Sequence, residues 1–198
     1  MSARATFLLN YLAYQVGWLA AIAGAGTGHG IAGAVVAAVL TAGHVILARE
    51  RGLEAALVVA ALLVGWGVES WQLAAGTYRL LEGAPATTVP PWLLALWAQF
   101  ATACRFSLAR VMTRPWRAAL FGALGGPVAF LAGERLGAVN LQTPLLPTLT
   151  RLLVAWALAL AALAWLARAM GESAGYRGPG AQRAGGQRVA LPRSSAPT

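Results

Sequence analysis

Residues 5–48 contain no Asp, Glu, Lys or Arg, and this uncharged stretch limits the possible folds more than any other feature of the chain. Crossing the ~30 Å hydrocarbon core of a membrane takes about 20 residues, so the stretch is too long for one helix and must fold back once. Glycine clusters interrupt helices, and residues 24–30 contain four glycines. The chain is therefore expected to begin with two apolar helices joined by a tight turn.

The composition extends this interpretation to the whole chain. Charged residues make up 11% of the 198 residues and hydrophobic residues 59%, whereas a soluble domain carries about 25% charged residues. We therefore predict an all-α, polytopic transmembrane helical bundle, in which a short fifth span rich in glycine could be kinked or re-entrant. Apolar segments indicate about six spans, at residues 7–23, 31–47, 53–73, 92–108, 118–131 and 149–167.

Arginine positions predict the orientation, because short loops rich in Lys and Arg stay on the cytoplasmic side. Six spans leave Arg79 and Arg135 on one side and eleven arginines on the other, which places both termini in the cytoplasm. The eleven are Arg4, Arg49, Arg51, Arg110, Arg114, Arg117, Arg168, Arg177, Arg183, Arg188 and Arg193.

The chain divides into a transmembrane helical domain, residues 1–170, and a tail, residues 171–198. The tail is rich in Gly, Pro, Ser, Gln and Arg, and such a segment cannot bury enough apolar area to offset the entropy lost on ordering. We predict a disordered basic cytoplasmic tail near anionic lipid. Its arginines could instead contact RNA or a protein partner, although no nucleic acid is expected as a partner.

Residues 28–33 match the G-x-G-x-x-G pattern of dinucleotide-binding folds. That pattern needs a soluble sheet of short strands and amphipathic helices, which this composition excludes. We interpret the glycines as a tight turn that also permits close packing of the first two spans.

Polar side chains inside the spans are the candidate functional groups, because an ionisable group in hydrocarbon is costly unless it is partnered or hydrated. A rise of ~1.5 Å per residue sorts them into two layers. The outer layer contains Glu69, Ser70, Gln72, Glu134, Arg135 and His29. The inner layer contains Arg105, His44, Asn10 and, in one alternative, Gln15.

Glu69 is expected to be the most function-sensitive of these groups, as an acid, base or ligand, with polar packing inside the bundle as the alternative. Its depth argues against a direct ion pair with Arg105, which is expected to extend toward the inner headgroups. Cys104 is the only cysteine and is expected to lie in the core. No H-x-x-H or E-x-x-H spacing occurs, so we predict neither a metal site nor a cofactor.

Three sequence blocks carry a resemblance to a known family: QVGW at residues 15–18, PWLLALWA at 91–98 and GGPVAFLAG at 125–133. In this order they resemble a family of small proteobacterial inner-membrane proteins whose function is unknown. The family often has Asp-Ser where this chain has Glu69-Ser70, and an Asn or His near the position of Arg105. The resemblance implies an inner-membrane protein whose genetic context is lipid modification and membrane stress, and it supplies no catalytic residues.

Three functions remain open. The first is an accessory component of a membrane-lipid modification or stress-response system, whose partners are membrane lipids and lipid-modifying enzymes. The second is a small permease or lipid transporter, which would need a polar path linking Glu69 to His44 and Arg105. The third is a membrane-embedded enzyme acting on a lipid or isoprenoid, which would need Glu69, Glu134 and His29 to converge. The sequence does not fix the oligomeric state.

Overall fold

The computed structural model describes residues 3–80 and 88–173, which form seven helices and one two-stranded ribbon. The long helices are α1 (Ala3–Gly26), α2 (Gly30–Leu47), α3 (Arg51–Ala74), α6 (Pro115–Arg135) and α7 (Leu145–Ser173). The shorter elements are α4 (Pro91–Cys104), α5 (Ala109–Met112), β1 (Tyr78–Leu80) and β2 (Val139–Leu141).

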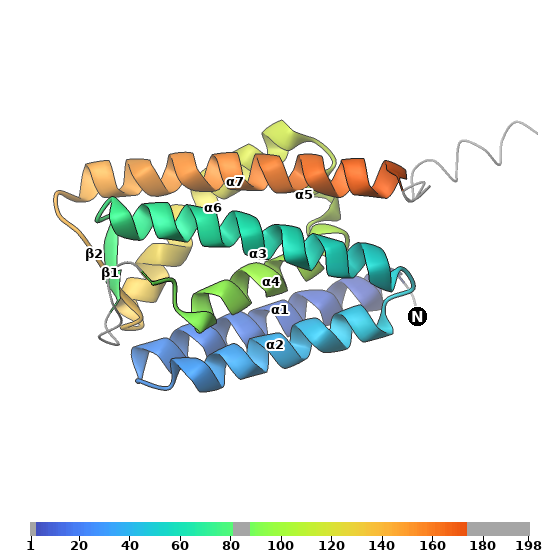
Figure 1. The fold of residues 1–198 in the computed structure, drawn as a ribbon, viewed down its shortest axis with the longest axis horizontal. Helices are drawn as coiled ribbons and strands as arrows, with labels where there is room; N and C mark the ends of the chain where they lie inside the picture. Colours follow the sequence, from blue (N-terminus) through green and yellow to red (C-terminus); the bar gives the residue numbers. More distant parts are fainter. Residues whose placement is uncertain (1–2, 81–87, 174–198) are drawn as a thin grey trace, which may run out of the picture.

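The helices lie side by side and alternate in direction along the chain (Figure 1). Helices α1 and α2 form one pair, α6 and α7 form another, and α4 packs against α1, α2 and α3 between them. The start of α1 and the end of α7 lie at the same end of the bundle, which we call the terminal end (Figure 1). The antiparallel ribbon of β1 and β2 lies at the other end, which we call the ribbon end.

The outward faces of the long helices are apolar. Five helices are long and apolar enough to cross a membrane: α1, α2, α3, α6 and α7. Large aliphatic side chains on them point away from the bundle, including Val39, Leu63, Leu124 and Leu158, each more than 60% exposed. Continuous apolar surfaces of this kind are unfavourable in water and are satisfied by lipid. The chain is therefore an all-α bundle with the character of a membrane protein.

Two of the predicted spans differ from the structure. The fourth was expected at residues 92–108, but α4 has 14 residues and ends at Cys104, so it is only about 21 Å long. The fifth span is neither short nor re-entrant, because α6 is a continuous helix of 21 residues that contains Pro127.

The turn between α1 and α2 confirms the packing interpretation of the glycine pattern. Gly28 has a φ of +77°, a left-handed conformation that glycine adopts without strain. A Cβ on Gly33 would collide with the backbone of Ala20 and Ala21 on α1. The glycines thus bring the two helices into backbone contact.

The ribbon and the end of α7 add two details to the predicted organisation. The ribbon pairs Tyr78 with Leu141 and Leu80 with Val139, and no sequence pattern had indicated it. Helix α7 continues to Ser173, three residues into the expected tail. The rest of that tail, residues 174–198, lies outside the described residues.

A glycine on α3 makes room for the side chain that joins α3 to α4. Trp97 of α4 is 2% exposed, and a Cβ on Gly65 would overlap its indole ring. Gly67 lies two residues further along α3, on the opposite face, and a Cβ built there has no atom within 4 Å.

We predict that Gly65→Ala lowers the free energy of unfolding by about 1–3 kcal/mol, because the added methyl group overpacks the seat of Trp97. The unfolding midpoint of the detergent-solubilised protein measures the effect. Gly67→Ala is the matched control and should leave the midpoint unchanged or slightly higher, since alanine favours helix. Equal midpoints for the two variants would show that the Trp97 indole does not pack against Gly65.

Candidate functional site

Glu69 is buried at the junction of α3, α4 and the ribbon. Its side chain is fully inaccessible. The Tyr78 hydroxyl donates a hydrogen bond of 2.7 Å to one carboxyl oxygen, and the Trp97 indole N–H donates one of 2.9 Å to the other. Burial raises the pKa of Tyr78 well above its ordinary value, and the neighbouring Glu69 adds to the shift, so the hydroxyl keeps its proton and remains a donor. Glu69 therefore links three elements through two donors.

The other residues of the predicted outer layer have separate partners. Gln72 accepts a hydrogen bond of 2.8 Å from the Thr77 hydroxyl. Glu134 accepts one of 2.8 Å from the backbone N–H of Leu141, which ties α6 to β2. His29 is exposed in the first turn and contacts the Thr27 carbonyl. Ser70 is half-buried and Arg135 is exposed. The outer layer therefore contains several local contacts and no common site.

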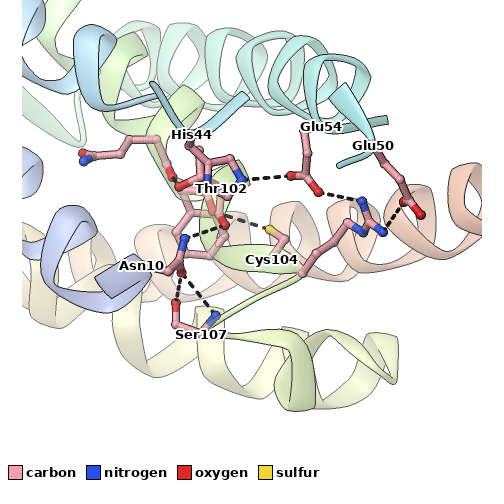
Figure 2. Close-up of polar contacts among 10 residues, drawn as sticks. Asn10, His44, Glu50, Glu54, Thr102, Cys104 and Ser107 are labelled. Carbon is pink, nitrogen blue, oxygen red and sulfur yellow. Dashed lines mark hydrogen bonds and ion pairs between the residues drawn. The ribbon is translucent and has the colours of Figure 1, made fainter. Parts of the chain in front are cut away.

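The inner layer forms a charged network near the terminal end (Figure 2). Arg105 donates hydrogen bonds of 2.6 Å to Glu54 and to Glu50 through its two terminal nitrogens. His44 lies 3.2 Å from the other oxygen of Glu54. The Glu54 side chain is 3% exposed and that of Arg105 is 13% exposed. Two carboxylates, one on α3 and one in the turn before it, therefore hold Arg105. Its extension toward the inner headgroups stays a prediction.

Asn10 of α1 completes the inner layer by satisfying the end of α4. Its amide donates a hydrogen bond of 3.0 Å to the carbonyl of Thr102, in the last turn of α4. Its carbonyl accepts bonds from the backbone N–H and the hydroxyl of Ser107 (Figure 2). The last four carbonyls of a helix lack partners within the helix. Asn10 supplies a partner for one of these carbonyls and, through Ser107, holds the chain that follows α4.

A large cavity of ≈230 Å³ lies between α1, α4, α6 and α7. One buried water needs only ~10–15 Å³ of such space, so the cavity is more than a packing defect. Aromatic side chains form much of its wall, together with glycines of α6. The aromatic residues are Tyr11, Tyr14, Trp18, Trp92, Trp97, Phe100, Phe121, Phe130 and Trp156. We call this cavity the aromatic cleft.

The polar candidates and the aromatic cleft are largely separate. Gln15 is the one predicted polar candidate among the cleft-lining residues, and Glu69 reaches the cleft only through Trp97. Sequence reasoning missed Glu50 and Glu54 as partners of Arg105. It also missed Tyr78, which no motif marks. Among residues 3–80 and 88–173, no three His, Cys, Asp or Glu side chains lie close enough together to hold a metal ion.

The comparisons identify a family without a known activity. A family model described as "Protein of unknown function (DUF2878)" matches residues 7–162, and the chain belongs to this family. No curated protein and no solved structure matches the chain.

We predict that Arg105→Met lowers the free energy of unfolding by about 3–5 kcal/mol, because it leaves the buried Glu54 carboxylate without its guanidinium. Arg110→Met is the control, since Arg110 is exposed and five residues further along the chain. Thermal unfolding in detergent compares the two. A midpoint for Arg105→Met as high as that of the control would contradict a structural role for the network.

Proposed function

We propose that this member of the DUF2878 family is a multi-pass bacterial inner-membrane protein that acts as a non-catalytic accessory component of a membrane-lipid modification or stress-response system. One observation carries the proposal: the ionisable groups inside the spans bond helices together, whereas the cavity large enough for a ligand has an aromatic and aliphatic wall. Such a wall suits a lipid chain and offers little acid–base chemistry.

The spacing of polar groups along α3 favours this proposal over transport. Glu54 and Glu69 lie on the buried face of α3, about 22 Å apart along the helix. The buried positions between them are Leu57, Ala60, Ala61 and Gly65, all apolar. A transported polar solute would need polar side chains along this interval.

The geometry of the outer layer favours the accessory role over an enzyme. Glu69 is fully buried and already accepts two hydrogen bonds, whereas His29 is exposed in the turn between α1 and α2. Glu134 bonds the ribbon backbone. The expectation that Glu69 acts as an acid, base or ligand stays a prediction, and its two partners favour a structural role instead.

Complementation of a deletion strain separates the two roles. We expect deletion to change the lipid profile of the membrane, measured by lipidomics beside the parent strain. Glu69→Gln, Glu134→Gln and His44→Gln should each restore the parental profile, because glutamine keeps a hydrogen-bonding group at each position but cannot exchange protons at neutral pH. An accessory role needs those bonds and no proton transfer.

Two outcomes of this experiment would contradict the proposal. One is a deletion strain whose lipid profile equals that of its parent under membrane stress. The other is a glutamine variant that accumulates in the membrane at the normal level yet leaves the profile of the deletion strain, which would assign chemistry to that residue.

The proposed orientation places the terminal end of the bundle in the cytoplasm. Its support is the charge of the described segments before α1, between α2 and α3 and around α5, where Arg4, Arg49, Arg51, Arg110, Arg114 and Arg117 are all exposed. We predict that a phosphatase reporter, which is active only in the periplasm, is active when fused after Gly76 and inactive when fused after Glu172. The reverse pattern would overturn the orientation.

A further inference from the structure

The aromatic cleft follows the direction of the membrane-spanning helices. Its wall on α1 extends from Tyr11 to Ile22, and its wall on α6 from Phe121 to Gly133. At ~1.5 Å per residue these walls are about 16–18 Å long. One leaflet contributes half of the ~30 Å hydrocarbon core, so the cleft matches the length of an acyl chain in one leaflet.

The cleft opens between α1 and α6, two of the helices that are long and apolar enough to cross a membrane. Tyr11 is 44% exposed and Phe121 40% exposed, and both belong to its wall. Tyr11 lies about 12 Å from the start of α1 and Phe121 about 9 Å from the start of α6. The opening between these two helices therefore lies in the half of the bundle nearest the terminal end, where an acyl chain of that leaflet can enter.

Each of these two walls leads back to an exposed arginine near the start of its helix. On α1, Tyr11, Gln15, Trp18 and Ile22 line the cleft at intervals of three and four residues, and the same spacing leads back to Arg4. On α6, Arg117 lies one turn before Phe121. Neither arginine forms an ion pair with any residue in 3–80 or 88–173, and the described part of α1 has no acidic side chain.

We propose that the aromatic cleft binds one acyl chain of an anionic phospholipid, with its phosphate at the mouth of the cleft, where Arg4 and Arg117 add positive charge from the two walls. The aromatic wall removes the chain from the bulk lipid, and the two guanidinium groups supply the charge that selects an anionic headgroup. This inference deepens the proposed function and rests on it for the choice of lipid as ligand.

The wall offers a position where the cleft can be filled without disturbing the bundle. Gly125 lines the cleft, and the nearest atom to a Cβ built there belongs to Phe121 at 4.0 Å. Gly125→Leu should therefore occupy the space of the acyl chain, and leucine favours helix more than glycine does. Gly67→Leu is the matched control, because Gly67 is a helical glycine with open space and lies outside the cleft wall.

Native mass spectrometry of the delipidated full-length protein in detergent tests the site, with dioleoylphosphatidylglycerol and dioleoylphosphatidylcholine as probes. We expect one retained phosphatidylglycerol, at least tenfold weaker binding in Gly125→Leu, and unchanged binding in Gly67→Leu. Arg4→Gln with Arg117→Gln should weaken phosphatidylglycerol binding about fivefold per arginine and remove its advantage over phosphatidylcholine. Arg49→Gln with Arg51→Gln removes the same amount of charge. This pair should change neither the affinity for phosphatidylglycerol nor its advantage over phosphatidylcholine.

The proposal is overturned if Gly125→Leu binds phosphatidylglycerol as the wild type does, or if the two arginine pairs have equal effects. A failure here with a changed lipid profile in the deletion strain would remove the cleft site and leave the accessory function standing. Phosphatidylglycerol binding with an unchanged lipid profile in the deletion strain would keep the cleft site and remove the accessory function.

Discussion

Helix α4 ends inside the bundle, and the arrangement of the other helices depends on how that end is satisfied. At about 21 Å it is shorter than the ~30 Å hydrocarbon core, and side chains of the neighbouring helices bond its last turn and the chain after it. Asn10 reaches from α1 to the carbonyl of Thr102, and Arg105 reaches to Glu50 and Glu54. These bonds join α4 to the helices on both sides of it.

The position of α4 also explains why the bundle contains a cleft. Helix α1 is held on α4, where Gln99 donates to the carbonyl of Ala13 and fits against Gly17. Helix α6 is held on α7 instead, where Gly122 and Gly126 leave room for Trp156. The two helices therefore have different anchors, and the space between them is the aromatic cleft, with α4 as part of its wall.

Hydrophobic length predicted the five long helices to within a few residues, because each must cross a membrane and little else determines its extent. The early end of α4 could not be predicted, because residues 99–110 contain no Gly or Pro and read as a continuing helix. Glu54 could have been predicted as a partner of Arg105 from the sequence, since the depth estimate that places Arg105 near the inner side also places Glu54 there. The three-residue strands of the ribbon are too short to show an alternating pattern.

An experimental density map of the protein in a nanodisc containing phosphatidylglycerol would show whether a short, internally satisfied α4 leaves a lipid-sized cleft between α1 and α6. We expect helical density for α4 to end at Cys104, Arg105 to lie between Glu50 and Glu54, and elongated density to fill the cleft. A continuous helix through Leu108 that crosses the whole membrane, with α1 and α6 packed directly together, would contradict this expectation.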